Sequence, residues 1–423
     1  MRDALERLAR LQLPIWLVLP MVALALAIGL GGGYVGGIFL RPSTACPETT
    51  DICTSFENFW KTWDLARDKY VDPQAVMPQK MIDGAIEGML DTLGDNGHTR
   101  YLAPDVARAE REELSGKFEG IGAYIDVKDG QPIIVQPMEG SPAEQAGLRP
   151  NDQILKVNGQ DMQGVTVAEL RNKVRGPKGT TVTLTIQHSG ETTPIDITIT
   201  RAEITSPSVS WHLLPNNVAL IHLNQFSERS SEEMKQALKD ARAQGASSIV
   251  LDLRNNPGGF VDELVGVASQ FLPENTTVLI EQDRDGTQTP RKTTAGGVAT
   301  DLPMVVLVNN NSASSAEILA GALKDAGRAR LIGEPTFGTA TVLQTFNLNG
   351  GAQVRIGTSQ WLTPKGQVVR GKGIQPDEIV ALAPDAAPLT PTNAAKLNAQ
   401  ELLNSSDAQL SRALAVLKGL AGQ

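Results

Sequence analysis

The sequence predicts a multidomain protein of mixed α/β and β structure, in which a membrane helix and a helical segment precede a small β-rich domain and a larger α/β core. The chain has 423 residues, more than one hydrophobic core usually organises. Residues 14–40 contain no charged side chain. Further along, apolar residues recur first with helical periods and then alternate as in strands, and finally strands alternate with helices. These observations predict the order of the domains.

Charge and composition exclude several classes of partner. The 38 basic and 47 acidic side chains give a net charge of -9 without long runs of either sign, which argues against a surface for nucleic acid. The sequence contains no cluster of metal-ligating residues and no glycine loop of the kind that binds nucleotides. We therefore predict no nucleic-acid partner, no metal and no other cofactor.

Residues 14–40 are predicted to form a single transmembrane anchor, because a helix needs about 20 apolar residues to cross a bilayer. Three basic residues precede the segment, Arg2, Arg7 and Arg10. Cytoplasmic flanks of membrane helices are enriched in such residues. Residues 1–13 are therefore predicted to be cytoplasmic, and the chain after Arg41 is predicted to lie on the extracytoplasmic side of a cell membrane.

Residues 41–53 are predicted to form a stalk between the anchor and the folded domains. Ser43 and Ala45 are small residues, so a cleaved signal peptide is the alternative to an anchor. The only two cysteines, Cys46 and Cys53, lie in this segment. A disulfide between them fits an oxidising compartment, and two free thiols are the alternative.

Two regions with different periods follow the stalk. Residues 54–113 are predicted to be helical, since "FENFWKTWDLARDKY" and "PQKMIDGAIEGMLDTLG" place apolar residues three and four apart. Residues 114–203 are predicted to form a β-rich domain, because apolar residues alternate in "QPIIVQPM" and "TTVTLTIQHSG". A domain of this length lies near the lower end of domain size.

The largest predicted domain is an α/β core over residues 204–382. Apolar runs such as "SIVLDLRNNPGG" and "MVVLVNNN" lead into helical patterns, an order typical of parallel strands buried on both faces. Residues 383–423 begin with the Pro- and Ala-rich stretch "APDAAPLTPTN" and are predicted to be a linker followed by one C-terminal helix.

The segment "GSPAEQAGLRPNDQILKVNGQDM", residues 140–162, resembles the middle of a PDZ domain, and "FEGIGAYI" upstream resembles its peptide-binding edge. PDZ domains bind a peptide C-terminus by strand addition, and backbone N–H groups of a glycine-containing loop hold its carboxylate. The resemblance implies that Gly120, Ile121 and Gly122 form this loop over residues 114–203. The alternative is that these glycines merely turn the chain.

Several further motifs occur in the order found in one enzyme family. "LDLRNNPGG", "SASSAEILAGALKDAGRA", "GEPTFG" and "GKGIQPD" resemble the carboxyl-terminal processing proteases, the serine peptidases of family S41 that are related to tail-specific proteases. The resemblance covers about residues 55–380. It implies a core fold like that of ClpP and crotonase and proteolysis of partners bound by their C-termini. The N-terminal helices offer a surface for homo-oligomers, and the sequence leaves the oligomeric state open.

Ser314 corresponds to the nucleophile of this family. A hydroxyl between a buried strand and a helix lies beside free backbone N–H groups and the positive end of the helix dipole, which stabilise an oxyanion. The resemblance implies that the backbone N–H groups of Ser315 and Gly258 donate to this oxyanion. The alternative is that Ser314 only caps the helix.

The general base of the family is missing. Its members pair the serine with a lysine inside Thr-Phe-Gly-Lys-Gly and with a glutamine shortly afterwards, but Thr339 and Leu343 occupy these positions here. Lysine is effective there because burial lowers its pKa until a neutral amine accepts the serine proton. Lys324 lies about 15 Å further along the predicted helix. Lys365 and Lys372 follow the next strand, and none of the three is a good replacement.

His98 is the candidate base, since a histidine titrates near neutrality. The stretch "LGDNGHTRYL" resembles a segment of the tricorn-like branch of the family, in which a histidine from the N-terminal part is the base. The alternative is that His98 only hydrogen-bonds a turn. A base would need an orienting carboxylate, for which Asp95, Glu334 and Asp377 are the candidates. The remaining histidines are expected to be structural: His188, His212 and His222.

Two functions are consistent with these motifs. The first is a membrane-anchored extracytoplasmic serine endopeptidase that recruits protein C-termini through its PDZ domain and cleaves with Ser314 and His98. The second is a catalytically inactive pseudoprotease that holds peptides through the same PDZ domain. The sequence favours the first because Ser314, its small neighbours and "NPGG" suit an oxyanion site.

Overall fold

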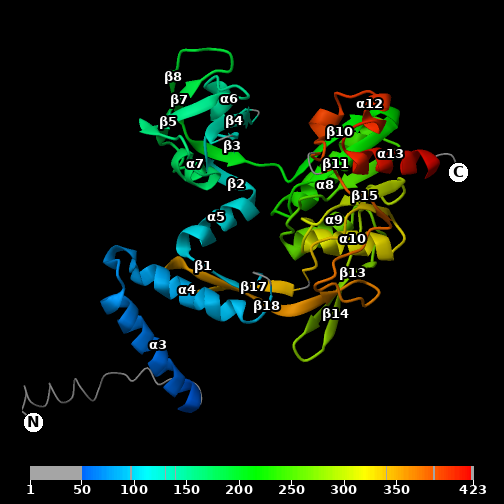
Figure 1. The fold of residues 1–423 in the computed structure, drawn as a ribbon. Coiled ribbons are helices and arrows are strands. Elements are labelled where there is room, and N and C mark those ends of the chain that lie inside the picture. The colour runs from blue at the N-terminus through cyan, green and yellow to red at the C-terminus, as the bar shows by residue number, and fades with distance from the viewer. Residues whose placement is uncertain are drawn as a thin grey trace, which may run out of the picture. The chain divides into compact units, whose positions relative to one another are not determined.

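The computed structural model describes residues 50–95, 98–128, 130–138, 140–339, 341–383 and 386–420. The predicted membrane span over 14–40 lies outside these ranges, as does Cys46 of the predicted disulfide. No helix inside them is long and apolar enough to cross a membrane. The described chain divides into two units at Met81, and Figure 1 labels the elements of both.

The described part of the first unit is helical, as its periods predicted. It contains α3 (Thr50–Lys69), the 3-10 turn η1 (Pro73–Ala75) and the first turn of α4 (Pro78–Asp91). On α3 the rings of Phe56, Phe59 and Trp60 contact one another edge to face, with centroids 6.1 and 5.2 Å apart. All three side chains are exposed, so α3 presents an aromatic surface.

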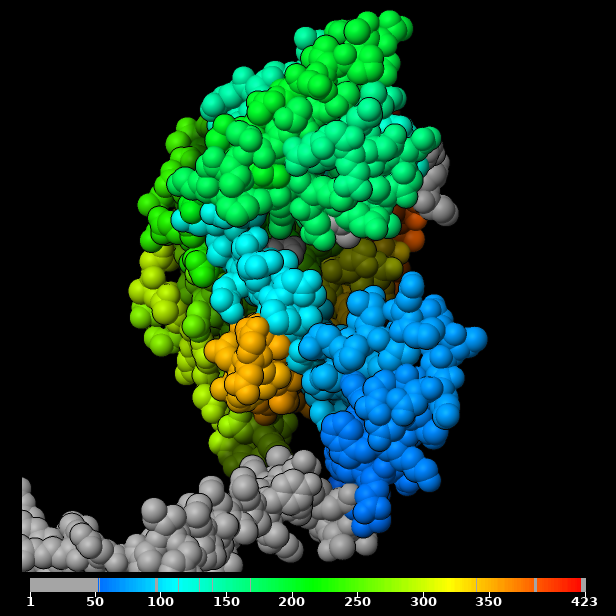
Figure 2. All heavy atoms as spheres, turned by 90° about the vertical axis from the view of Figure 1, so that its left-hand side faces the viewer, coloured from blue at the N-terminus to red at the C-terminus, as the bar shows by residue number. Residues whose placement is uncertain are grey.

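The second unit contains an antiparallel sheet whose order is β1–β18–β13–β14, with β17 along the other edge of β18. Its strands are β1 (Arg100–Leu102), β13 (Thr277–Asp283), β14 (Gln288–Lys292), β17 (Thr341–Asn347) and β18 (Gln353–Leu362). Leu90 of α4 packs on Tyr101 and Ala352 at one face. The turn η3 (Asn349–Gly351) contacts the start of α5 (Pro104–Ser115), orange against cyan in Figure 2.

The β-rich domain has a sheet in the order β3–β4–β5–β7–β8 with β6 beside β5, and a separate pair formed by β2 and β9. The strands are β2 (Lys117–Gly120), β3 (Ala123–Lys128), β4 (Gln131–Pro137), β5 (Gln153–Val157), β6 (Gln160–Asp161), β7 (Thr181–Gln187), β8 (Ile195–Thr200) and β9 (Ala202–Thr205). Two short helices, α6 (Pro142–Gln145) and α7 (Val167–Val174), complete the domain. Its core includes Ile134, Ile154 and Leu184, which are fully buried, and along β7 buried residues alternate with more exposed ones.

The α/β core is built on a sheet in the order β10–β11–β12–β15–β16–β19, in which only β10 is antiparallel. The strands are β10 (Val209–Leu214), β11 (Val218–Leu223), β12 (Ser248–Asp252), β15 (Met304–Val308), β16 (Arg330–Gly333) and β19 (Glu378–Ile379), with the 3-10 turn η2 (Pro215–Asn217) between the first two. A predominantly parallel sheet confirms the α/β prediction.

Helices cover both faces of this sheet (Figure 1). Residues of β15 alternate between the faces: Val306 and Val308 pack toward α8 (Ser230–Ala243), α9 (Val261–Ala268) and α10 (Ser315–Asp325), and Val305 and Leu307 toward the C-terminal helices. This alternation explains why the strand is a continuous apolar run in the sequence.

The C-terminal segment forms three helices rather than the one expected, namely α11 (Pro391–Ala394), α12 (Ala399–Leu403) and α13 (Ala408–Leu420). Polar residues interrupt the helical pattern: the Asn398 side chain accepts the N–H groups of Gln400 and Glu401, which starts α12 afresh. Leu402, Leu410 and Ala413 are buried against the sheet.

A buried ionic network joins these helices to the end of β12. Arg254, which is completely buried, donates to Asp252 at 2.6 Å and to Asp407 at 2.7 Å. Burial by itself would raise the pKa of Asp252, but the charge of Arg254 and the hydrogen bonds that Arg254 donates lower it to about 2. The network therefore fixes the C-terminal segment next to the "NNPGG" loop.

Candidate active site

Ser314 lies in a strained turn between β15 and α10. Its φ is 53° and its ψ is -120°, a region that residues other than glycine rarely adopt. Hydrogen bonds on either side hold the turn: Ala313 N–H donates to the Asn256 carbonyl at 2.9 Å, and Ser312 Oγ donates to the Leu253 carbonyl at 2.8 Å. Backbone strain of this kind occurs chiefly at functional sites, and it is retained here although the usual lysine is absent.

Gly258 and Gly259 bring the second loop against this turn. Their φ values are 100° and 137°. A Cβ on Gly258 would lie 2.7 Å from Ser314 Cβ and 2.9 Å from Ser315 N, so only glycine allows this approach. The N–H of Gly258 donates to Asn256 Oδ1 at 2.8 Å. The Gly258 N–H is therefore already paired with a neighbouring side chain. The roles of the Gly258 and Ser315 N–H groups as oxyanion donors stay predictions.

Thr339 has a structural role in this arrangement. Its Oγ1 accepts the Ser314 N–H at 2.8 Å and donates to Glu317 Oε2 at 2.7 Å. The side chain is almost completely buried. Because a threonine hydroxyl has no useful basicity and this one already donates its proton to a carboxylate, it is not available to accept the serine proton.

Glu317 is the centre of this network. Its completely buried carboxylate accepts hydrogen bonds from five donors: Thr336 Oγ1, Gly338 N–H, Thr339 N–H, Thr339 Oγ1 and Ser314 N–H. No cation pairs with it among the described residues, so hydrogen bonds alone stabilise the buried charge. In the sequence, Glu317 is one residue of the motif "SASSAEILAGALKDAGRA". The signal for its role was its position three residues after Ser314, which is the spacing of a capping box.

His98 and Ser314 line the same cavity, which has a volume of about 490 Å³. Leu343, at the position of the family glutamine, lines it as well. Burial lowers the pKa of His98, although the charges of Asp95 and Glu317 act in the opposite direction. Its Nδ1 is buried and has no hydrogen-bond partner within the described ranges. The cavity therefore holds a neutral imidazole and a strained serine.

No carboxylate of the described chain hydrogen-bonds the His98 ring. Asp95 Oδ2 accepts from Thr99 Oγ1 at 2.8 Å. Asp377 is paired with Lys324 at 3.0 Å. Glu334 is not among the residues that line the serine cavity. The three candidate orienting residues thus supply no Ser-His-Asp arrangement, and the charge of Asp95 acts on His98 only through space.

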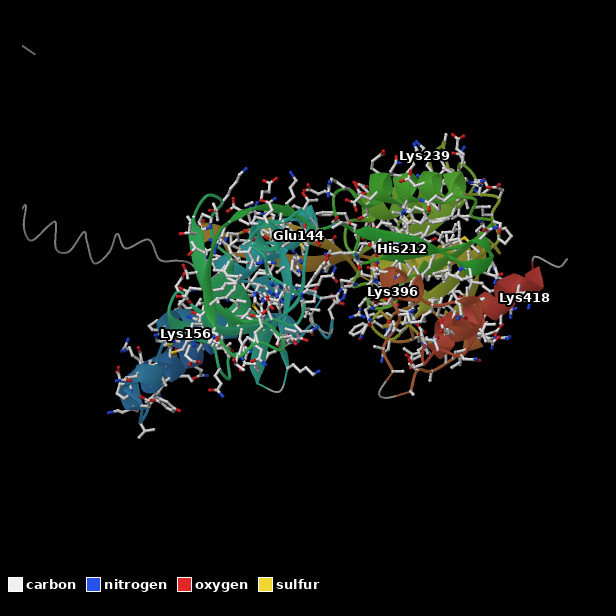
Figure 3. All side chains as sticks on the ribbon, turned by 90° about the horizontal axis from the view of Figure 1, so that it is seen from above. Glu144, Lys156, His212, Lys239, Lys396 and Lys418 are labelled. Carbon is white, nitrogen blue, oxygen red and sulfur yellow. The ribbon has the colours of Figure 1, made fainter. Side chains whose placement is uncertain are left out.

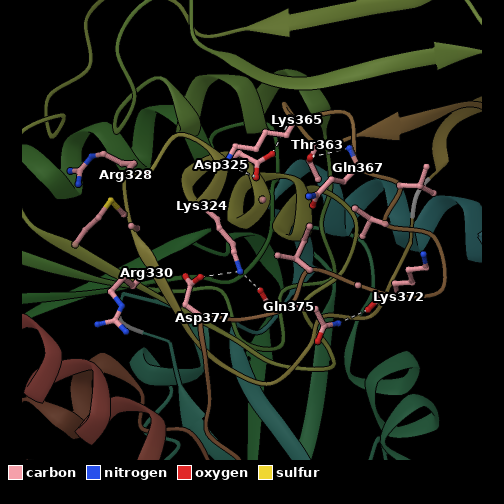
Figure 4. Close-up of a pocket in the computed structure, with 18 of the residues that line it drawn as sticks. Lys324, Asp325, Arg328, Arg330, Thr363, Lys365, Gln367, Lys372, Gln375 and Asp377 are labelled. Atoms are coloured by element: carbon pink, nitrogen blue, oxygen red, sulfur yellow. Dashed lines mark hydrogen bonds and ion pairs between the residues drawn. The ribbon is translucent and has the colours of Figure 1, made fainter.

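The lysines considered as replacements line a different cavity, of about 1200 Å³ (Figure 4). Lys324 donates to the Gln375 carbonyl at 2.7 Å, and Lys365 pairs with Asp325 at 3.9 Å. Lys372 belongs to the same cavity, which shares no lining residue with that of Ser314. None of these three lysines reaches the serine cavity.

The other histidines have partners elsewhere. His188 Nδ1 lies 2.7 Å from Asp152 Oδ1 in the β-rich domain, and His222 Nδ1 lies 3.8 Å from Asp252. His212 on β10 lies 3.3 Å from Thr392 Oγ1, near Lys396 in Figure 3. None of them lines the serine cavity.

Comparison with known proteins places this geometry in one family. Residues 217–380 match the model of peptidase family S41, and residues 133–188 match the model of a PDZ domain. The chain is 36% identical to the carboxy-terminal processing protease CtpA of Bacillus subtilis over 79% of this chain and 71% of that protein. It is 38% identical to the carboxyl-terminal-processing protease of Synechocystis over 85% of this chain and 82% of that protein.

The chain belongs to peptidase family S41, the carboxyl-terminal processing serine peptidases. A putative S41 protease from Bacteroides fragilis has a similar fold, with a TM-score of 0.52 at 19% identity over 85% of this chain and 96% of that one. The sequence motifs had predicted both the family and the PDZ domain, and both predictions are confirmed.

The S41 peptidase carries its predicted peptide-binding loop in a third cavity, of about 380 Å³. Gly120, Ile121 and Gly122 line it. Gly122 has a φ of 75°, and a Cβ there would lie 2.4 Å from Ser141 Cβ, so the loop requires glycine. The Ile121 carbonyl accepts the Ala143 N–H at 2.8 Å. The loop is thereby tied to the helix that follows it in the PDZ motif.

Proposed function

We propose that this protein is a membrane-anchored extracytoplasmic serine endopeptidase that recruits protein C-termini through its PDZ domain and uses Ser314 as nucleophile and His98 as general base. The observation that carries the proposal is the shared cavity of the two residues. The titratable residues that line it are His98, Arg100, Glu110 and Arg355. Glu110 lies in ion pairs with both arginines, so His98 is the uncharged base of the lining.

The chemistry follows the acyl-enzyme route. Ser314 Oγ forms a bond with the scissile carbonyl carbon while its proton moves to the imidazole of His98. The carbonyl oxygen becomes an oxyanion at the head of α10, where the Ser315 N–H and the helix dipole favour negative charge. The peptide C–N bond then breaks, His98 returns the proton to the leaving amine, and water hydrolyses the ester.

The test compares the full chain, purified in detergent, with Ser314→Ala, His98→Ala and His212→Ala. His212 is the matched control because it lies outside the serine cavity. Cleavage of an unstructured protein is expected in the parent and in His212→Ala and is expected to be lost in the other two variants. Cleavage that persists in His98→Ala would remove His98 as the base. Cleavage that persists in Ser314→Ala would contradict the whole mechanism.

The second candidate is a pseudoprotease that binds peptide C-termini without cutting them. The observation that favours it is the replacement of both family partners by Thr339 and Leu343, together with the lack of a hydrogen bond between His98 and Ser314 in the described chain. A fluorophosphonate probe that reacts with activated serines distinguishes the two. Binding of a peptide C-terminus without labelling or cleavage would support the pseudoprotease.

Membrane attachment and self-association are further parts of the proposal. The uncharged residues 14–40 support a single anchor, and the exposed aromatic side chains of α3 support homo-oligomers through the N-terminal helices. Extraction of the protein from membranes by alkaline carbonate would contradict the anchor. A monomeric mass of the detergent-solubilised chain in sedimentation would contradict the oligomer.

A further inference from the structure

We propose that the serine cavity selects substrates with an acidic residue within about two positions of the scissile bond, and that Arg355 binds this side chain with support from Arg100. This inference deepens the proposed function and rests on it in one respect, because it takes the serine cavity as the place where the peptide lies. Three properties of an Arg–Glu–Arg cluster in the cavity wall support the inference: its net charge, the strand register that positions it, and N–H groups that make no hydrogen bond.

The cluster consists of Arg100 on β1, Glu110 on α5 and Arg355 on β18. Arg100 Nη2 donates to Glu110 Oε1 at 2.5 Å, and Arg355 Nη1 lies 2.6 Å from Glu110 Oε2. One carboxylate shared by two guanidinium groups leaves one positive charge. His98 does not offset it, because a lowered pKa keeps the imidazole uncharged at neutral pH. The lining of the serine cavity therefore carries a net positive charge.

The Arg355 guanidinium has N–H groups that can donate to a ligand. Glu110 Oε2 accepts no hydrogen bond in spite of its contact with Arg355, so the guanidinium is not aligned with that carboxylate. The Arg355 side chain makes no hydrogen bond within the described ranges, although only 15% of it is exposed. A largely enclosed guanidinium whose N–H groups make no hydrogen bond is suited to a carboxylate, which accepts two parallel hydrogen bonds from it.

The sheet register places this cluster close to the reaction centre. Arg100 pairs with Arg355, and Arg355 pairs with Thr345 on the next strand, so the three side chains form one row on one face. Leu343 lies two residues from Thr345, and His98 two residues from Arg100. Along β17 two residues span about 6.8 Å, which is also the spacing of alternate side chains in an extended peptide. His98 lies in a bend before β1 and is placed near the cluster by its position in the same cavity lining. A substrate residue near the scissile bond therefore comes within reach of Arg355.

The experiment measures binding in the full chain carrying Ser314→Ala, so that no cleavage is needed. Dye-labelled peptides share one apolar sequence and one C-terminus, so that the PDZ domain contributes equally to each. Asp or Asn is placed in turn at each of the three positions on either side of the expected scissile bond. At one or two neighbouring positions Asp is expected to bind about tenfold more tightly than Asn, because hydrogen bonds to charged groups are the stronger ones.

Arg355→Gln is expected to abolish the preference for Asp, Arg355→Lys to retain part of it, and Arg284→Gln to retain all of it. Arg284 is the matched control because it is exposed and outside the cavity. If the Ser314→Ala protein binds the Asp and Asn peptides equally at every position, the inference is overturned. It is also overturned if the preference for Asp survives in Arg355→Gln. A parent that cuts nothing while its Ser314→Ala form still prefers Asp would overturn the peptidase and support this inference.

Discussion

Replacement of Thr339 by valine tests whether the residue at the missing-lysine position has become a structural part of the site. Valine keeps the shape of the side chain and removes Oγ1. The Ser314 N–H loses its 2.8 Å acceptor, and Glu317 loses the 2.7 Å donor. Four donors remain on the buried carboxylate, so it is not left bare.

The expected loss is about 2 kcal/mol, within the range of a hydrogen bond to a charged group. In a domain of this size that corresponds to a fall of roughly 4–8 °C in the Tm of the peptidase core. Calorimetry of the full chain measures it, with Thr358→Val as the matched control, since Thr358 is an exposed threonine of β18. We also expect slower labelling of Ser314 by a fluorophosphonate, because the strained turn loses a support. A Thr339→Val protein that melts with the control would refute the structural role.

Four further outcomes follow from the same contacts. Asp407→Ala leaves Arg254 buried with one partner fewer and should lower the free energy of unfolding by about 3–5 kcal/mol in urea titrations; a variant as stable as the parent would contradict this. The folded pKa of Asp252, about 2, lies below its unfolded value of 3.8, so its contribution is complete above pH 4. About 2 kcal/mol should be lost as the pH falls from 4 to 2, and Asp252→Asn should remove that pH dependence. Burial lowers the pKa of His98, so the acid limb of kcat/KM should have its midpoint below pH 6.5; a midpoint at or above 6.5 would exclude His98. Thr339→Lys in a His98→Ala background should restore cleavage, and no activity there would show that position 339 no longer accommodates a base.

The family and the strand, loop and helix around Ser314 could be predicted from the sequence because their determinants are local. A buried strand, a loop of small residues and a helix head occur as one contiguous run around Ser314. Gly258 and Gly122 are required where backbones approach too closely for a Cβ, and such requirements appear as glycine-containing motifs. The PDZ domain was recognisable for the same reason.

The partners of the site were not predictable, because strand register and the face on which a side chain lies are set by packing between distant segments. Spacing along the chain did not indicate that Glu317 accepts hydrogen bonds from five donors. It also did not indicate that the C-terminal helices are joined to the core by the ion pair of Asp407 and Arg254. Nor did it indicate that Arg355 lies opposite Arg100 in the cavity wall.

The sequence by itself therefore determined the family of this protein, the serine that corresponds to the family nucleophile and the absence of the family lysine. Only the tertiary structure decided which side chains share a cavity with Ser314, and these include His98 and none of the three lysines. The physical reason is that a motif fixes backbone geometry over a few residues, whereas proton transfer depends on side chains that meet only when separate strands and loops have packed together.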